Sequence, residues 1–325
     1  MVSPRFDICG IGNAIVDVVA PVEEAFLSRH DMHKGAMALI DAATADKLYA
    51  AMPAGTESSG GSAANTCAVA AGLGAKVAYL GKVAADQLGA VFAHDIRAAG
   101  VTFPTVPLAG GAPTARCLIM VTHDGQRTMN TFLGACVTFG ETDVDEALVA
   151  DAAVTYLEGY LFDPPAAQAA FRRAAAAAHA AGRQVSLSLS DAFCVDRHRA
   201  AFRDLVAGHV DILFANEAEI CSLYECNEFA DAAALVRQDV ALAALTRSEA
   251  GSLVIHGNET VEVAAAPATV VDTTGAGDAY AAGFLAGLTA GRPLADCGRM
   301  GSIAAAEVIG HYGARPMRDL RPLVA

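Results

Sequence analysis

The sequence predicts an α/β protein in which helices cover both faces of a mainly parallel sheet, with a second, small sheet beside it. From about residue 150, short apolar segments alternate with longer segments of helical period, which is typical of a parallel sheet. Residues 104–133 depart from this alternation, because the turn "HDGQ" separates two strand-like segments in the manner of a hairpin. The 325 residues suffice for one large α/β domain, or for a large domain and a small one.

In the first half of the chain, the hydrophobic pattern changes between a period of two and a helical period. Apolar segments bounded by turn residues predict strands at 6–12, 14–20, 35–41, 76–84, 113–122 and 127–134. Ala-rich and amphipathic segments predict helices at 62–75 and 86–100. The early hairpins do not fit a parallel layer, so we expect a separate small sheet, a candidate lid, built from about 14–45 and 104–133.

In the second half, strands and helices follow one another regularly. The predicted strands are 152–160, 184–190, 210–216 and 241–248, and the predicted helices are 165–182, 198–208, 217–224 and a last helix from about Ala279 onward. No internal repeat or low-complexity linker interrupts the chain, so the lid and the large α/β domain are expected to form a single unit over residues 1–325.

Composition and charge exclude several classes of protein. A net charge of −14 and a pI near 5.0 argue against a nucleic-acid surface. No run of 18 apolar residues lacks a charge, and no signal peptide is recognisable, so we expect no membrane partner and a cytoplasmic protein. The eight cysteines form no C-x-x-C pair and are expected to be reduced core thiols.

The stretch "VVDTTGAGDAYAAGFLAGL", residues 270–288, places a carboxylate where a glycine turn becomes a helix. Gly275 and Gly277 have no Cβ, so the chain can turn tightly there and leave its N–H groups open. N–H groups at the positive end of a helix dipole bind anions. Asp278 can therefore be the N-cap of the helix, a common role of aspartate, or a base beside an anion site.

Other motifs narrow the classes of enzyme further. A Walker A pattern is absent, because Gly81 and Lys82 are followed by Val83. A dinucleotide fingerprint fails at its third glycine, where Ile15 or Tyr280 stands, which argues against a dehydrogenase. The hydrolase patterns G-x-S-x-G and H-E-x-x-H do not occur.

Three further stretches place polar residues beside predicted strands or glycine turns. They are "GNAIVD" (12–17), "GGSAAN" (60–65) and "NEAE" (216–219), which directly follows the strand "DILFA". Ligands bind at the carboxyl ends of the strands in a parallel sheet. Each stretch alone is also compatible with a solvated loop or helix start.

Together with the glycine stretch, these segments closely resemble the PfkB, or ribokinase-like, family of carbohydrate and nucleoside kinases. "GGSAANTCAVAAGLGA" is similar to its N-terminal signature and "DTTGAGDAYAAGF" to its C-terminal signature, and the resemblance covers essentially the whole chain. It implies a Rossmann-like three-layer sandwich with a small β-sheet lid, and ATP-dependent phosphorylation of a hydroxymethyl group. ATP and Mg²⁺ are the implied cofactors, and a monovalent cation such as K⁺ is a further candidate.

Within this family the chain is most similar to adenosine kinases, through "GGS", "APTARCLIMVT" and "QRTMNTFLGA". The implied reaction is phosphorylation of the 5′-hydroxyl of adenosine to AMP, a step of purine salvage. By resemblance, catalysis would involve Asp278 as base, Gly275, Ala276 and Gly277 as anion hole, and Arg127 from the lid. The acceptor would be bound by Asn13, Asp17, Gly61, Ser62, Asn65, Met129, Thr131 and Leu133. ATP would be bound by Asn216, Glu219, Thr246, Gly251, Thr274 and Gly277, with Glu219 reaching magnesium through water.

Several alternatives remain open at the level of sequence. The acceptor can instead be ribose or another sugar, or inosine or guanosine. A further hypothesis is that the protein binds a nucleoside without catalysing a reaction. Either Tyr160 or Phe162 can stack on a base. The expected partners are therefore a small acceptor and ATP, and a monomer is slightly favoured over a homodimer.

Overall fold

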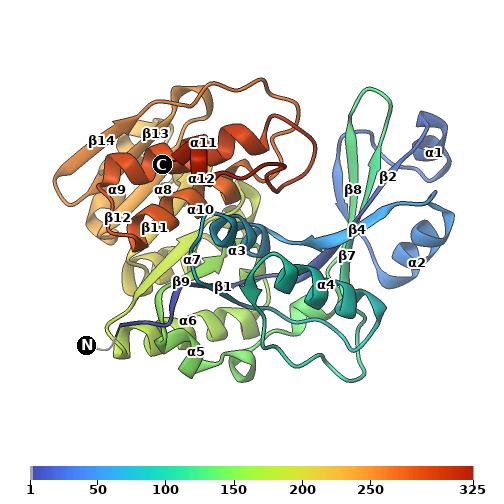
Figure 1. Ribbon diagram of the computed structural model, residues 1–325, viewed down its shortest axis with the longest axis horizontal. Coiled ribbons are helices and arrows are strands. Elements are labelled where there is room, and N and C mark those ends of the chain that lie inside the picture. Colours follow the sequence, from blue (N-terminus) through green and yellow to red (C-terminus); the bar gives the residue numbers. More distant parts are fainter. Residues whose placement is uncertain (1–2, 325) are drawn as a thin grey trace.

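Two β-sheets organise the molecule in the computed structural model, which describes residues 3–324 (Figure 1). The larger sheet has nine strands in the order β14-β13-β12-β11-β10-β9-β1-β5-β6. They are β1 (Phe6–Ile11), β5 (Val77–Leu80), β6 (Val101–Thr102), β9 (Ala152–Glu158), β10 (Gln184–Ser188), β11 (Ile212–Asn216), β12 (Leu242–Thr246), β13 (Ser252–His256) and β14 (Glu259–Val263). All neighbours are parallel except β12–β13 and β13–β14. The prediction of a mainly parallel sheet is confirmed.

Helices cover both faces of this sheet, because successive residues of each strand point to opposite sides. In β9, Tyr156 belongs to one hydrophobic core and Leu157 to the other. The first core contains α3 (Ser62–Gly72), α4 (Gln87–Ala98), α10 (Ala276–Thr289) and α11 (Leu294–Val308). The second contains α5 (Glu146–Ala150), α6 (Pro165–Ala180), α7 (Ala192–His209), α8 (Glu217–Tyr224) and α9 (Phe229–Asp239). The three-layer sandwich is thus confirmed.

The small sheet has the strand order β3-β8-β7-β2-β4 and lies at the right of Figure 1. Its strands are β2 (Ile15–Pro21), β3 (Met37–Leu39), β4 (Thr56–Gly60), β7 (Ala115–Val121) and β8 (Arg127–Phe132). Strand β4 lies outside the two segments assigned to the lid from sequence, and residues 104–114 contain no strand. Whether this sheet moves as a lid remains a prediction.

One face of the small sheet is covered and the other is not. Val18 and Leu118 pack in the same core as Phe26 of α1 (Glu24–Arg29) and Leu48 of α2 (Ala42–Ala51). The opposite face carries the side chains of Asp17, Cys117, Thr131 and Leu39, which are paired across β2, β7, β8 and β3. Leu39 and Met37 on this second face are exposed, so this part of the face is open to the rest of the site.

The remaining elements are short. They are α12 (Arg321–Val324) and the 3₁₀ turns η1 (Gly134–Thr138), η2 (Glu141–Asp143), η3 (Gly159–Phe162) and η4 (Ser248–Ala250). The sequence analysis missed α1, α2, α5, α9, α11, α12, the strands β4 and β6 and the β13–β14 hairpin. It also began the glycine-rich helix at Ala279, whereas α10 begins at Ala276. No helix within residues 3–324 is long and apolar enough to cross a membrane.

Candidate active site

The glycine stretch forms the N-terminus of α10, and Asp278 is the third residue of that helix. Gly275 is the N-cap, in the left-handed region with φ +78. A Cβ on Gly275 would lie 2.7 Å from the Cα of Ala314, so only glycine fits there. Because Gly275 is the N-cap, the interpretation of Asp278 as the N-cap is wrong. Instead, Oδ1 of Asp278 accepts a hydrogen bond at 2.6 Å from the hydroxyl of Ser62, the first residue of α3.

Two backbone donors are free beside this carboxylate. The N–H groups of Gly277 and Asp278 have no hydrogen-bond partner within residues 3–324, whereas that of Ala276 donates to Thr273 O at 3.2 Å. A Cβ on Gly277 would meet no atom within 4 Å, so this glycine borders open space. Free N–H groups at a helix N-terminus that face open space are suited to bind an anion.

The environment of Asp278 makes it a stronger base than an exposed aspartate. Burial raises its pKa to about 6, and the charge of Asp17 contributes to the rise, while hydrogen bonds from Ser62 and Asn65 oppose it. The carboxyl group is thus mainly ionised at neutral pH, with a pKa close enough to neutrality to take up a proton during a reaction.

The turn that leads into α3 brings a second set of polar groups to the same place. Gly61 has φ +95, and a Cβ there would lie 2.1 Å from Asn13 O. Asn65 lies one turn into α3, and its Oδ1 accepts a hydrogen bond from Nε of Arg315 at 3.0 Å. Burial raises the pKa of Asp17 to about 6, although Arg315 and Arg127 lower it. Arg315 gave no signal in the sequence, because it comes 37 residues after the glycine motif in an irregular segment.

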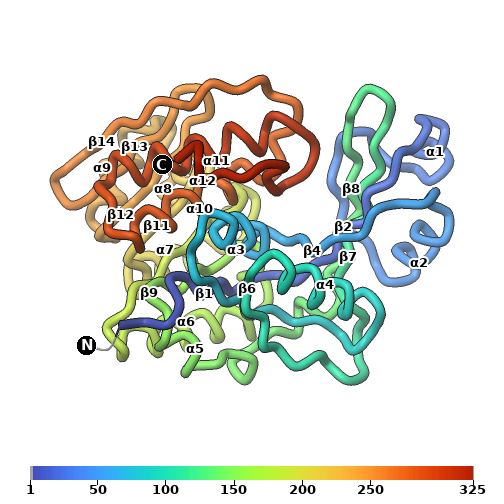
Figure 2. Tube along the Cα trace, viewed as in Figure 1, coloured from blue at the N-terminus to red at the C-terminus, as the bar shows by residue number. Residues whose placement is uncertain are grey.

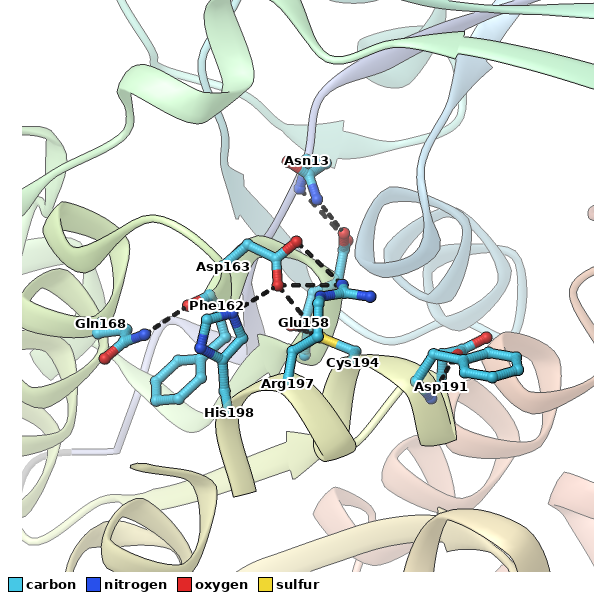
Figure 3. A network of polar contacts seen from close by, with 11 residues as sticks. Asn13, Glu158, Phe162, Asp163, Gln168, Asp191, Cys194, Arg197 and His198 are labelled. Carbon is cyan, nitrogen blue, oxygen red and sulfur yellow. Dashed lines mark hydrogen bonds and ion pairs between the residues drawn. The ribbon is translucent and has the colours of Figure 1, made fainter. Parts of the chain in front are cut away.

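Glu158 is a further site residue that the sequence analysis missed. Its Oε1 accepts from Nδ2 of Asn13 at 2.7 Å, and its Oε2 accepts from the backbone N–H groups of Ala63 and Asn13 at 2.8 and 3.3 Å (Figure 3). Burial raises the pKa of Glu158 to about 7, against the effect of these donors. The sequence does contain a signal for Glu158, because it is an acidic residue at the carboxyl end of a central strand, where ligands bind.

Arg127 connects the small sheet to the glycine turn. Its guanidinium forms an ion pair with Asp272, whose Oδ1 also accepts from the N–H and the hydroxyl of Thr274 at 3.0 and 2.7 Å. Both side chains of the pair are 9% exposed, and Nε of Arg127 is buried without a hydrogen-bond partner among the residues that the structure describes. A buried arginine with an unused donor is suited to receive an anionic ligand.

The uncovered face of the small sheet is largely apolar. Met129 is paired with Met37, and Thr131 with Leu39. Met37 and Leu39 are 56% and 61% exposed, and both lie on the face that also carries Asp17. Next to them is a cavity of about 280 Å³, lined by Leu39, Ile40, Thr131, Phe132, Leu133 and Val137. The sequence analysis found Met129, Thr131 and Leu133 but not the contribution of β3.

Burial distinguishes the two aromatic residues after Gly159. Phe162 is fully buried and packs against Phe171 and Phe202, so it cannot contact a ligand. Tyr160 is 42% exposed at the carboxyl end of β9. Phe193, which follows β10, is 74% exposed and is a second aromatic side chain at this edge.

The expected ATP-binding residues lie at neighbouring strand ends. Asn216 and Glu219 form a capping box at the start of α8, and Asn216 is paired with Thr246 across β11 and β12. Burial raises the pKa of Glu219 to about 7, and the charges of Asp191 and Asp278 add to the rise. Gly251 has φ +83, and a Cβ there would lie 2.0 Å from Val263 O, so only glycine fits in the β12–β13 turn. That Gly251 contacts ATP stays a prediction.

No cluster of three or more His, Cys, Asp or Glu side chains within residues 3–324 is arranged to hold a metal ion directly. Glu219 uses both carboxylate oxygens for Asn216, at 3.0 Å to its N–H and 2.6 Å to Nδ2. A magnesium ion that keeps most of its water shell is compatible with such a site, because Mg²⁺ dehydrates reluctantly and is held largely by substrate phosphates.

Comparisons with known proteins identify the family and the fold of the chain. The family model described as pfkB family carbohydrate kinase matches residues 8–320. The solved structure of adenosine kinase from Sinorhizobium meliloti is 53% identical, with a TM-score of 0.89 and coverage of 98% of both chains. That of a probable sugar kinase protein from Rhizobium etli CFN 42 is 51% identical, with a TM-score of 0.90 and the same coverage. Adenosine kinase of Dictyostelium discoideum is 26% identical, over 93% of this chain and 94% of its own.

Proposed function

The chain belongs to the pfkB family of carbohydrate kinases, and from this premise we propose that it phosphorylates the 5′-hydroxyl of adenosine with ATP, giving AMP and ADP. Membership makes the protein a kinase, with ATP as the phosphoryl donor and typically Mg²⁺ as its companion. The observation that carries the proposal is the arrangement at α10, where the Asp278 carboxylate stands beside two unpartnered N–H groups.

The chemistry follows from this arrangement. Asp278 accepts the proton of the acceptor hydroxyl as that oxygen bonds to the γ-phosphorus and the bond from phosphorus to the ADP oxygen breaks. Charge on the equatorial oxygens of the transferring group is stabilised by the N–H groups of Gly277 and Asp278 and by Arg127. The two N–H groups belong to the folded start of α10, so they would need little reorganisation during transfer.

The polar half of the acceptor site is suited to a sugar. Asp17 and Asn65 would bind vicinal ribose hydroxyls, and Ser62 and Asn13 border the same space. Arg315 orients Asn65 by a hydrogen bond, and Glu158 orients Asn13 in the same way. Such contacts are equally useful to a free sugar and a nucleoside, so they do not identify the base.

The apolar face of the small sheet supports a nucleoside. Met37, Leu39 and Met129 present apolar surface on the same face as Asp17, where a free sugar would leave it exposed. A purine that buries ~100 Å² of this surface would gain about 2.5 kcal/mol, or somewhat under two decades of affinity. Tyr160 and Phe193 supply aromatic surface at the neighbouring strand ends.

On the ATP side, Asn216, Thr246 and Thr274 would contact the nucleotide, and Glu219 would reach magnesium through water. The proximity of Asn216 and Thr246 at adjacent strand ends supports this assignment. ATP, the phosphoryl donor, would then lie on the far side of Asp278 from the acceptor hydroxyl, as in-line transfer requires.

A sugar acceptor is the second candidate, because a probable sugar kinase protein is about as similar to this chain as the adenosine kinase of S. meliloti. We therefore propose to measure kcat/KM for adenosine, inosine, guanosine and ribose in the parent and in Met129→Asp. We expect the parent to prefer adenosine and the variant to lose adenosine activity selectively. Val106→Asp is the matched control, since Val106 is an exposed apolar residue outside the small sheet. A parent that prefers ribose, or equal losses for all acceptors, would support the sugar kinase instead.

A further inference from the structure

The eight cysteines fall into two groups by burial. Six are buried, namely Cys9, Cys67, Cys117, Cys136, Cys194 and Cys297. Cys221 and Cys226 are partly exposed and lie five residues apart around the C-terminal end of α8. The expectation of core thiols holds only in part for this pair, which packs against the second core but is partly exposed. Partial exposure distinguishes these two thiols from the other six.

The backbone at the end of α8 brings the two residues close together. Glu225 is left-handed, with φ +53 and ψ 40. The N–H of Cys226 donates to Cys221 O at 3.0 Å, and the N–H of Glu225 donates to Ser222 O at 3.3 Å. These two hydrogen bonds define a Schellman motif, in which the side chains of the residues joined by the longer-range bond frequently meet. Cys221 and Cys226 both pack against the second hydrophobic core.

Helix α7 holds this turn in place. Nε of Arg199 donates to Ser222 O at 2.8 Å, and the guanidinium pairs with Glu225. The hydroxyl of Ser222 donates to Asp196 at 2.6 Å. The two residues are thus kept close together in the chain turn by contacts of the backbone and of neighbouring side chains. The thiol of Cys226 donates to Tyr224 O at 3.4 Å, so it must leave this weak contact to reach Cys221.

We infer that Cys221 and Cys226 form a reversible oxidation site, at which a peroxide or a small-molecule disulfide converts the two thiols into an intramolecular disulfide. With hydrogen peroxide, one thiolate attacks a peroxide oxygen, giving a sulfenic acid and one water. The second thiol then attacks the sulfenic sulfur and releases another water. The thiols lose two electrons and two protons in all, and the peroxide is reduced to two waters.

The neighbourhood predicts how the reaction depends on pH. Burial raises the pKa of Cys221, and the charge of Glu217 adds to the rise. Because the thiolate is the attacking species, oxidation is expected to be slow at neutral pH and to accelerate at alkaline pH.

The test is thiol mapping of the intact protein. After treatment with hydrogen peroxide at alkaline pH, we expect the peptide that contains Cys221 and Cys226 to resist alkylation until dithiothreitol is added. In Cys221→Ser and in Cys226→Ser the remaining thiol should not form this bridge, whereas Cys297→Ser should form it as the parent does. The disulfide should raise Tm by about 3 °C, because it closes a short loop in the unfolded chain. Alkylation of both thiols after peroxide treatment, or a bridge to any other cysteine, would overturn the inference.

Discussion

At the scale of single residues, the carboxylate of Asp278 combines a reactive position with a raised pKa. Asp278→Asn keeps an oxygen that can accept from Ser62 but cannot take up the proton of the hydroxyl. We expect kcat to fall by on the order of 10²–10⁴, with adenosine binding largely kept. Steady-state kinetics and calorimetric binding measure the two quantities. Turnover within a few-fold of the parent would show that Asp278 only supports the helix start.

The same substitution is expected to stabilise the protein at neutral pH. The pKa of Asp278 is about 6 in the folded protein, above its ordinary value of 3.8. The folded state therefore binds more protons than the unfolded state between these values, and the free energy of unfolding falls as pH rises through this window. The destabilisation is complete above pH 6 and absent below 3.8. Because the side chain is partly exposed, about 1–2 kcal/mol is expected.

Melting curves at two pH values measure this effect. Asp278→Asn should melt about 2 °C above the parent at pH ~7.5, and the difference should shrink towards pH ~4. Ser62→Ala, which removes the donor but keeps the carboxylate, is the control and should not gain stability. A difference that stays constant with pH would show that the charge of Asp278 is not its cause.

At the scale of elements, helix α7 is bent at His198, where the backbone leaves the helical region with φ −128 and ψ 24. The bend directs His198 and Arg197 to Asp163, at 2.9 and 3.0 Å, directly after η3 (Figure 3). The thiol of Cys194 donates to Gly159 O at 3.3 Å. These contacts fix η3, which carries Tyr160.

Removing the contacts of Asp163 should therefore change adenosine binding by changing the position of Tyr160. We expect Asp163→Ala to raise KM for adenosine about two- to fivefold, with kcat and KM for ATP little changed, because each exposed ion pair contributes up to about 1 kcal/mol. In a Tyr160→Ala background the same substitution should have no further effect on KM. Arg172→Ala is the control, since Arg172 pairs with Asp204 between α6 and α7 but away from η3. Additive effects of Asp163→Ala and Tyr160→Ala would contradict the explanation.

At the scale of the whole molecule, the small sheet contacts the large domain through the β7–β8 hairpin, which lies beside the C-terminal segment (Figure 2). Asp272 forms an ion pair with Arg127 and accepts a hydrogen bond from the N–H of Gly313 at 3.2 Å. At the tip, Gly125 has φ +79, and a Cβ there would overlap the hydroxyl of Tyr312. These contacts hold Arg127 against Asp272, three residues before the glycine turn that starts α10.

Arg127→Ala should lower kcat by about 10²–10³ and weaken adenosine binding much less, because an arginine that stabilises the transferring group acts mainly in the transition state. Arg116→Ala is the matched control. Arg116 lies on β7 of the same sheet but pairs with Asp46 of α2 on the covered face. It should lower stability without a comparable loss of kcat. Equal effects of the two substitutions on kcat would argue against a catalytic contact by Arg127.

The sequence alone determined the family, the mainly parallel sheet and the residues of the glycine-rich turn. These are local features: glycine positions, helix periodicity and residues at strand ends depend on a few neighbours in the chain. Only the tertiary structure decided that Asp278 faces Ser62, that Phe162 is buried while Tyr160 is exposed, and that Glu158, Arg315 and β3 join the site. The residue pairs Asp278–Ser62 and Arg315–Asn65 are 216 and 250 residues apart, so their contact depends on how the two sheets and helix layers pack, which no local pattern encodes.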